Sequence, residues 1–193
     1  MGIYNGTKGI KGFSSASGYA LCGYLSNPYE ALSCQAIVPS NESKKYTPCV
    51  AVVLKNGANE NIIGHQNAFS PNNIYIDKVA EATDKIDAFI IESETNIIGQ
   101  DEFEPIEQGT VQVARIGSGA ITFLPCNVNL AGVSLSTKIY WHTENKELTK
   151  TEDTGKTIAL DIQILGSVTK GQKRQITDNS KSWVDCNCVE VKL

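Results

Sequence analysis

The sequence predicts an all-β fold, a small barrel or sandwich of short antiparallel strands with an irregular N-terminal arm. Three observations support this class. Short runs rich in β-branched and aromatic residues recur after Thr47 at a spacing of roughly 8–15 residues. Turn-forming residues such as Asn-Gly and Gly-Ser-Gly separate these runs, and helical periodicity is almost absent. Barrels and sandwiches are built from this pattern of strands and turns.

The first half of the β-rich region contains three expected strands. The run Cys49–Leu54 is β-branched and ends at the turn signal Lys55-Asn56-Gly57. Two further apolar runs follow, at Ile74–Val79 and Ala88–Glu92. Between them, Glu81–Asp87 predicts either one helical turn or a loop.

The second half adds two expected hairpins and a closing strand. Thr110–Ile116 alternates and is followed by Gly117-Ser118-Gly119 and Ala120–Leu124, so residues 110–124 predict a hairpin. A second hairpin is expected around His142–Asn145 from the runs Ser136–Trp141 and Lys146–Leu148. One long or two short strands are then expected in Thr157–Val168, and a last strand in Trp183–Val191.

The N-terminal part differs in composition and hydrophobic periodicity from the rest of the chain. This difference predicts an arm (residues 1–47) and a β-rich domain (residues 48–193). Residues 1–17 carry four glycines and three serines without a regular period. A short helix is expected near Pro28–Gln35, with Asn27 as N-cap. Four aromatic residues fall within residues 13–29, which favours an arm that orders against the body or a neighbouring subunit.

Composition excludes several classes of protein. The 193 residues carry a net charge of -4 and only two arginines, so nucleic acid is a poor partner. No apolar run approaches the roughly 18 residues that a membrane helix needs, and residues 1–20 lack the apolar stretch of a signal peptide. Residues 77–107 hold ten acids and two lysines. This acidic stretch predicts a solvated face or, alternatively, a face that meets a basic partner or a divalent cation.

The cysteines leave three interpretations open. Without an export signal, reduced and buried thiols are expected, but a metal site and a disulfide stay possible. On an alternating strand, Cys186 and Cys188 point to the same side. A zinc site needs about four ligands, and no second Cys/His cluster lies nearby in the sequence. The chain has six cysteines: Cys22, Cys34, Cys49, Cys126, Cys186 and Cys188.

No catalytic motif is present, so neither an enzyme nor a cofactor or metal site is expected. His65 and His142 are the two histidines, and each is expected at a surface or turn. A Ser–His–Asp or Cys–His site remains an alternative, because such groups come together in space and not in sequence. Trp141 and Trp183 lie in expected strands and are expected in the core.

The strand and glycine pattern from residue 48 to residue 191 resembles the capsid cement (decoration) proteins of tailed bacteriophages. The resemblance lies in a β-rich opening, an apolar strand, a glycine-bounded hairpin followed by another apolar strand, and late glycine-flanked strands. The segments that carry it are Pro48–Leu54, Ala88–Glu92, Glu107–Gly117, Ala120–Leu124, Asn129–Val133, Lys138–Tyr140 and Gly166–Val168. The long N-terminal arm and the six cysteines depart from the family pattern.

This resemblance implies a non-enzymatic structural protein of the virion. It would be made in the host bacterial cytoplasm and bind the capsid exterior as a homotrimer between adjacent major capsid proteins, stabilising the expanded shell. Neither nucleic acid, membrane nor a small-molecule substrate would be a partner. Candidate anchors on the arm are Tyr4, Phe13, Tyr19, Tyr24 and Tyr29, each of which could instead pack within its own subunit.

Two alternatives come from other classes of protein. One is a carbohydrate- or receptor-binding β-module of a phage tail or fibre, which would need exposed aromatic rings on one face. The other is a small hydrolase, which would need His65 or His142 within reach of a Ser or Cys.

Overall fold

The computed structural model describes residues 20–26, 33–38, 46–56, 74–92, 110–134, 136–176 and 181–193. These residues are almost entirely β-strands and turns, which confirms the all-β class. The barrel strands are β2 (Ser33–Ile37), β3 (Ala51–Asn56), β4 (Ile74–Val79), β5 (Ala88–Ile91) and β6 (Thr110–Arg115). The remaining elements are β1 (Ala20–Leu21), β7 (Ile121–Pro125), the 3-10 helix η3 (Val128–Leu130), β8 (Ile139–His142), β9 (Glu147–Thr149), β10 (Thr157–Leu160), β11 (Gln163–Ile164), β12 (Thr169–Ile176) and β13 (Lys181–Lys192).

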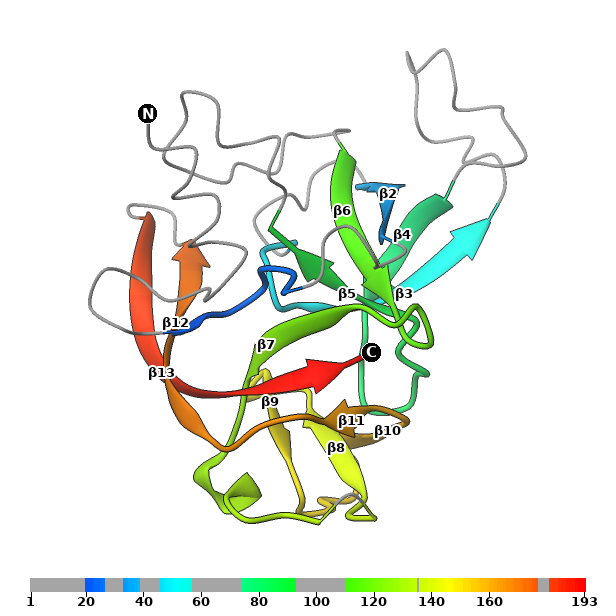
Figure 1. Ribbon diagram of the computed structural model, residues 1–193. Helices are drawn as coiled ribbons and strands as arrows, with labels where there is room; N and C mark the ends of the chain where they lie inside the picture. The colour runs from blue at the N-terminus through cyan, green and yellow to red at the C-terminus, as the bar shows by residue number, and fades with distance from the viewer. Residues whose placement is uncertain are drawn as a thin grey trace, which may run out of the picture.

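Five strands close into a barrel in the order β2-β4-β3-β5-β6, with β6 pairing back to β2 (Figure 1). All pairs are antiparallel except β2 with β4. Alternate residues of these strands fill the interior, as expected for a small barrel. The interior core contains Ala36, Val38, Tyr46, Val50, Val52, Ile76, Ala88, Ile90, Val111 and Val113.

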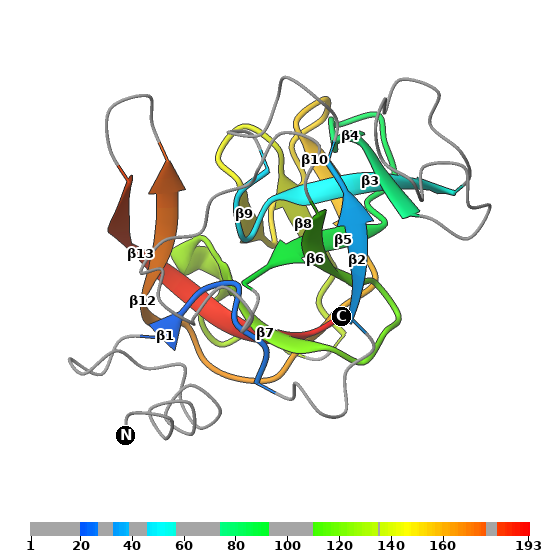
Figure 2. The same ribbon diagram turned by 90° about the horizontal axis from the view of Figure 1, so that it is seen from above.

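A second sheet runs beside the barrel in the order β1-β12-β13-β11, and β7 also pairs with β13. Strands β12 and β13 form a long antiparallel ribbon, from Thr169 opposite Cys188 to Ile176 opposite Lys181. The far end of this ribbon extends away from the barrel in both views (Figures 1 and 2). The first part of the twelve-residue β13 therefore pairs with β12 in the ribbon, and its last part pairs with β7 and β11.

A third, three-stranded sheet has the order β10-β8-β9. Its β8–β9 hairpin lies where the sequence predicts it. Trp141 of β8 is 2% exposed and meets Phe89 of β5 edge to face, with ring centroids 5.1 Å apart. This contact joins the third sheet to the barrel wall and confirms the expected core position of Trp141. Trp183, by contrast, is only half-buried, on the ribbon.

Strand β5 is buried on both faces and separates two cores. Ala88 and Ile90 point into the barrel, whereas Phe89 and Ile91 point outward into a second core shared with the other sheets. A strand covered on both sides needs an uninterrupted apolar run, and Ala88–Ile91 provides one. Strand β5 (Ala88–Ile91) is therefore a wall shared by the barrel and the outer sheets, and we call it the β5 wall.

The predicted hairpin over residues 110–124 is wrong. Strand β6 pairs with β2 and β5 in the barrel, while β7 pairs with β13 in the second sheet. The turn Gly117–Gly119 instead carries the chain from one sheet to the other. Both of its glycines have positive φ, and Gly119 N donates to Leu193 O at 2.9 Å. Next to this turn the end of β13 pairs with the start of β7, with Lys192 opposite Ile121, so β7 does not pair with β6.

The helix expected near Pro28–Gln35 is also wrong where the structure describes it. Residues 33–37 form β2, whose Cys34 lies opposite Val113 of β6. Pairing within the barrel overrides the local capping signal, which is a weak preference by comparison. Residues 27–32 lie outside the described residues.

The division at residue 47 does not separate arm from body in the described residues. Strand β1 pairs in parallel with β12, and β2 is a barrel strand. Residues 1–19 of the expected arm lie outside the described residues.

Two further expectations have definite outcomes. Glu81–Asp87 is a loop with a tight turn, in which Asp84 N donates to Glu81 O at 2.8 Å. Thr157–Val168 contains two short strands, β10 and β11, which belong to different sheets.

Strand β12 was not expected, because its lysines, glutamines and glycine give no apolar alternation. No helix among the described residues has the length and apolarity to cross a membrane.

Replacing Phe89 with alanine tests the role of the β5 wall. Phe89 is fully buried, so Phe89→Ala should lower the free energy of unfolding by about 3–5 kcal/mol, as measured by urea denaturation. Val128 is 64% exposed, and Val128→Ala should change this free energy by no more than about 0.5 kcal/mol. Equal effects of the two substitutions would contradict the proposed wall.

Candidate functional site

A buried ion pair joins the end of the barrel wall to the ribbon. Arg174 Nε of β12 donates to Glu92 Oε1, just beyond β5, at 2.8 Å. The two side chains are 8% and 3% exposed. The guanidinium carbon of Arg174 also lies 4.6 Å from the ring centroid of Trp183 on β13, a cation–π distance. Arg174 therefore connects three strands at one point.

Tyr24 lies at the same ion pair. Burial, together with the charge of Glu92, raises the pKa of the Tyr24 hydroxyl to about 12. Burial also raises the pKa of Glu92, although the Arg174 guanidinium opposes this. Tyr24 is half-buried in its own subunit, the arrangement that the sequence left as the alternative to partner binding. The other candidate anchors, Tyr4, Phe13, Tyr19 and Tyr29, lie outside the described residues.

A hollow of about 410 Å³ opens beside this ion pair, at the seam between barrel and ribbon. Three cationic side chains line it: Lys146, Lys173 and Arg174. Arg174 is already paired with Glu92. An anionic group in the hollow would therefore contact Lys146 and Lys173. Neither lysine was singled out from the sequence, because β12 and the β8–β9 turn bring them together only in the fold. The other lining residues are Thr47, Pro48, Cys49, Val50, Pro125 and Gln175.

Thiols from separate segments meet at the same seam. Cys22 is fully buried, and its Sγ lies 3.7 Å from Sγ of Cys186 on β13. The thiols of Cys188 and Cys49 also lie within interaction range of Cys22. We call Cys22, Cys49, Cys186 and Cys188 the thiol cluster. Cys186 and Cys188 share one face of β13, as the sequence predicts.

The backbone around the thiol cluster is unusual at Cys49. This residue has φ 71°, a left-handed conformation that is uncommon outside glycine. It follows Pro48 in a turn closed by Val50 N donating to Thr47 O at 3.2 Å, and glycine or asparagine normally occupies this turn position. A Cβ added at the neighbouring Gly23 would lie 3.3 Å from Cys49 Sγ.

Gly171 of β12 makes room for the second half of the cluster. A Cβ added there would lie 2.4 Å from Cys188 Sγ and 2.9 Å from Ala20 O, so no larger residue fits without movement. The absence of a side chain on β12 therefore lets a thiol of β13 and the backbone of β1 approach one another. A glycine inside a strand is a recognised sign of such close approach, and this was the signal available in the sequence.

The thiols of the seam differ in acidity. The pKa of Cys186 is lowered, chiefly because the Cys22 thiol donates a hydrogen bond to it and secondarily because Lys173 is near. The pKa of Cys22 is raised by the neighbouring thiols and by burial. Burial is also the main cause that raises the pKa of Cys126 to about 12. Among the residues that the structure describes, no group of three or more His, Cys, Asp or Glu side chains is arranged to hold a metal ion.

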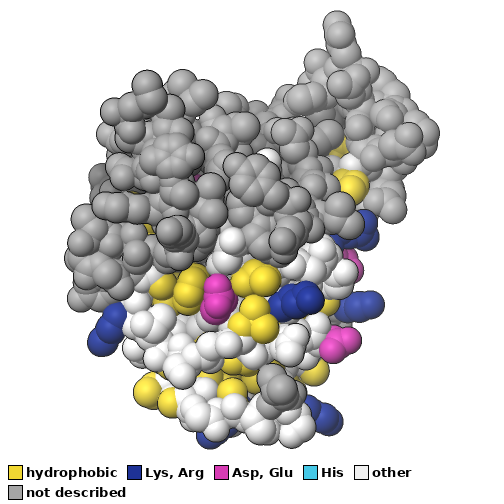
Figure 3. All heavy atoms as spheres, in the orientation of Figure 1, with side chains coloured by type: hydrophobic (Ala, Val, Ile, Leu, Met, Phe, Trp, Pro, Cys, Tyr) yellow, Lys and Arg dark blue, Asp and Glu magenta, His cyan; other side chains and the backbone are white. Residues whose placement is uncertain are grey.

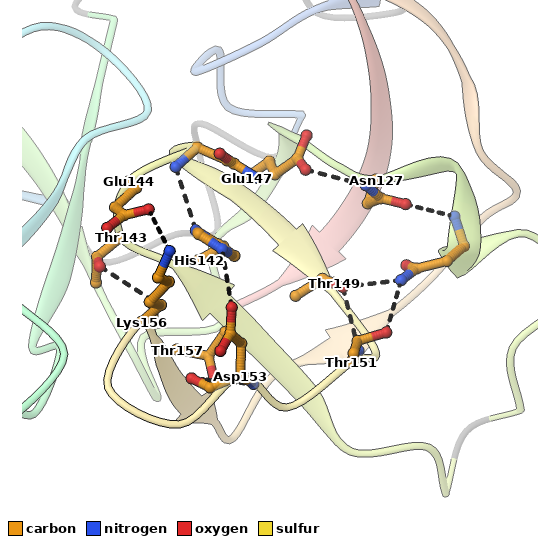
Figure 4. Close-up of polar contacts among 12 residues, drawn as sticks. Asn127, His142, Thr143, Glu144, Glu147, Thr149, Thr151, Asp153, Lys156 and Thr157 are labelled. Atoms are coloured by element: carbon orange, nitrogen blue, oxygen red, sulfur yellow. Dashed lines mark hydrogen bonds and ion pairs between the residues drawn. The ribbon is translucent and has the colours of Figure 1, made fainter.

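A network of polar side chains covers the third sheet (Figure 4). Asn127 caps η3 by accepting from Asn129 N at 3.0 Å, and its Nδ2 donates to Glu147 Oε1 at 3.1 Å. Asn129 Nδ2 in turn donates to the hydroxyls of Thr149 at 2.9 Å and Thr151 at 3.1 Å. These bonds fix η3 against β9, so this end of the molecule presents side chains in defined positions.

His142 is part of this network. Its Nδ1 accepts from Asn145 N at 3.2 Å, and its Nε2 lies 3.9 Å from Asp153 Oδ2. Lys156 and Glu144 form an ion pair nearby, with Nζ and Oε2 3.1 Å apart. His142 is thus the last residue of β8, partly buried beside the turn, and its contacts join two loops of the third sheet. His65 lies outside the described residues.

The described part of the acidic stretch, residues 77–92, makes contacts within the subunit. Asp77 pairs with Lys55 at 2.8 Å and Asp84 with Lys78 at 2.9 Å. Asp87 Oδ2 accepts from Leu54 N at 2.9 Å. Several acids of this stretch therefore support the barrel strands, a role that net charge alone does not reveal.

The surface of the described residues is mixed. Figure 3 shows apolar side chains on one face, interspersed with charged and polar ones. Among the large hydrophobic side chains described, Val128 and Leu165 are exposed, by 64% and 41%. Val128 lies between the two asparagines that fix η3, so an apolar group is held among ordered polar ones.

Replacing Arg174 with methionine tests the buried ion pair. Without the guanidinium, the pKa of Glu92 should rise further above its unfolded value of about 4.3. A carboxyl with a raised folded pKa supports the fold below its unfolded pKa, and this support is lost as pH rises through the folded pKa. Arg174→Met should therefore cost about 3–5 kcal/mol of unfolding free energy near pH 8 and less near pH 5.

Urea denaturation at both pH values measures this effect. Glu92→Gln combined with Arg174→Met should recover part of the loss near pH 8, because no unpaired charge remains. Lys55→Met, which breaks an exposed pair, is the matched control and should have little effect. A loss in Arg174→Met that does not depend on pH would contradict the burial of a charged Glu92.

The order of thiol alkylation tests the acidities. Because the thiolate is the reactive form, iodoacetamide at about pH 8 should modify Cys186 first and Cys22 and Cys126 last in the folded chain. Peptide mass mapping over time gives the order. In urea-unfolded chain the three rates should converge, and a folded chain in which Cys126 reacts as fast as Cys186 would refute this prediction.

Comparison with known proteins adds no assignment: no protein-family model, no curated protein and no solved structure matches the chain.

Proposed function

We propose that this chain is a structural cement protein, which binds the outer surface of a tailed-phage head between adjacent major capsid proteins and stabilises the expanded shell. The proposal rests on the resemblance of its strand and glycine pattern to that family. The observation that carries it furthest in the structure is the doubly buried β5 wall. Two cores on one wall give a body that can transmit force between neighbours without changing shape.

The polar end formed by η3 and the third sheet supports a docking role. Its side chains are already held by hydrogen bonds, for example from Asn129 to Thr149 and Thr151, so fixing them in an interface costs little additional entropy. The exposed Val128 among them offers a small apolar contact. A stable interface needs about 1,200–2,000 Å² of buried surface, so further anchors are required.

The segment before β1 is the proposed source of those anchors. Tyr4, Phe13 and Tyr19 precede Ala20, where the first described strand begins. Aromatic side chains supply a large contact area at low entropic cost and are frequent at the centres of interfaces. Repetition over many copies on a shell would add the contributions of individually modest contacts.

The alternative, a carbohydrate- or receptor-binding module of a tail or fibre, requires open aromatic ring faces. Trp141 is in the core, and the ring of Trp183 has the Arg174 guanidinium stacked on one face. Neither tryptophan, both of which lie among the described residues, therefore supports the carbohydrate alternative.

Co-sedimentation with shells tests the proposal. The purified chain should pellet in a saturable manner with expanded empty heads built from its cognate major capsid protein, and less with unexpanded heads. Light scattering of the isolated chain should give the mass of a trimer. Binding to neither form of shell would refute the proposal, and capture of the chain on immobilised glycans instead would favour the alternative.

Removal of residues 1–19 tests the anchors. The truncated chain keeps every described strand, and its urea unfolding midpoint is measured so that a loss of folding is distinguished from a loss of binding. Its affinity for expanded heads should fall by at least about tenfold, the equivalent of about 1.4 kcal/mol. Triple replacement of Tyr4, Phe13 and Tyr19 by serine is the matched variant and should reproduce the loss. Unchanged affinity in both variants would exclude these residues as anchors.

A further inference from the structure

We propose that Cys22 and Cys186 are a site of reversible oxidation, at which the two thiols form a disulfide that fastens the segment after β1 to β13. This inference concerns the chain's own residues and holds whichever partner the chain binds.

The geometry brings together two thiols that are 164 positions apart in the chain. Their Sγ atoms are 3.7 Å apart, and a disulfide requires closure to about 2.05 Å. Cys22 is tied to the ribbon because its backbone N donates to Gln172 O at 2.9 Å. Cys186 lies opposite Gly171 on the neighbouring strand, where no side chain stands between the two thiols on β12.

The two thiols have different environments, which gives each a role. Cys186 is half-buried and so is within reach of a small oxidant, and its pKa is lowered by the hydrogen bond from Cys22 and by Lys173. Asp185, the adjacent acid, acts in the opposite direction. Cys22 is fully buried and has a raised pKa. Cys186 is therefore the attacking thiol and Cys22 the resolving one.

The reaction takes a low-molecular-weight dialkyl disulfide as oxidant. The Cys186 thiolate attacks one sulfur of this disulfide, its S–S bond breaks, and a mixed disulfide forms while the first small thiolate leaves and takes a proton from solvent. Cys22 then attacks the Cys186 sulfur, and its proton passes to the second small thiolate as that leaves. Overall, two protein thiols lose two electrons and two protons, and the dialkyl disulfide becomes two thiols.

The other thiols of the seam are less suited than Cys186 to attack the oxidant. Cys188 is fully buried over Gly171, and Cys49 is held by the strained turn beside Gly23. Burial keeps the Cys126 thiol protonated, with a pKa of about 12. The Cys22–Cys186 pair combines an accessible thiol with a partner whose sulfur lies within 4 Å.

Oxidised glutathione is the probe that tests this site. The reduced full-length chain is incubated with it, the remaining thiols are alkylated, and the peptides are mapped by mass spectrometry. The expected product links the peptide of Cys22 to that of Cys186, at a rate independent of protein concentration. Its urea unfolding midpoint should rise above that of the reduced chain, because the crosslink closes a long loop.

Variants assign the roles. Cys22→Ser should accumulate glutathione on Cys186, since the resolving thiol is missing, and Cys186→Ser should give neither product. Cys126→Ser is the matched control and should form the link as the natural chain does. Circular dichroism confirms folding, and Cys22→Ala replaces Cys22→Ser if the serine variant is unfolded.

Three results would overturn the proposal. The first is a natural chain that forms no link under these conditions, and the second is a link that joins Cys186 to a cysteine other than Cys22. The third is a stoichiometric zinc ion, measured by elemental analysis of the purified chain, that protects the cluster from glutathione.

Discussion

Strand β5 is buried on both faces, and both the barrel core and the outer core are built against it. Ile90 completes the interior of the barrel, and Phe89 on the opposite face meets Trp141 of the third sheet. Neither core could be dismantled without exposing the other side of the same strand. Interiors are close-packed and tolerate little change in volume, so a common wall couples the two cores mechanically. The same coupling explains why the described residues form one body despite having three sheets.

Beyond the apolar core, polar and sulfur-containing groups connect the barrel to the β12–β13 ribbon. Beyond β5, the chain leaves the wall at Glu92, and the ribbon supplies Arg174 to compensate the buried carboxylate. The thiol cluster lies at the same seam, where Gly171 and the turn at Cys49 allow segments to approach closely. Buried charges are costly unless paired, so this seam is fixed in one arrangement when the pair forms. It is also where chemistry, in the form of thiol exchange, is accessible.

These features suit a protein whose proposed work is to hold neighbours together. A body with two coupled cores resists distortion, and ordered polar side chains around η3 need little rearrangement to meet a partner. A disulfide between Cys22 and Cys186 would add a covalent tie from the first described segment to the last strand. The body would then supply rigidity, and the proposed anchors before Ala20 would bind the neighbouring subunits.

Local sequence predicted the all-β class and most of the strands after residue 48, because alternation and β-branched runs are local properties. Ile74–Val79 is a strand with the predicted limits, and the β8–β9 hairpin forms around His142–Asn145 as predicted. The shared facing of Cys186 and Cys188 followed from strand geometry alone. These features depend on neighbours in the chain and need no knowledge of the partner strands.

The pairing of the strands and the groups that meet at the seam follow from long-range contacts instead. Pairing between β7 and β13 replaced the expected hairpin, and pairing between β2 and β6 replaced the expected helix, because contacts over long sequence separation outweigh local turn and capping preferences. The ion pair of Glu92 with Arg174 and the approach of Cys22 to Cys186 span 82 and 164 positions. A local sequence pattern cannot reveal contacts between residues so far apart in the chain. These groups therefore come together only in the folded protein.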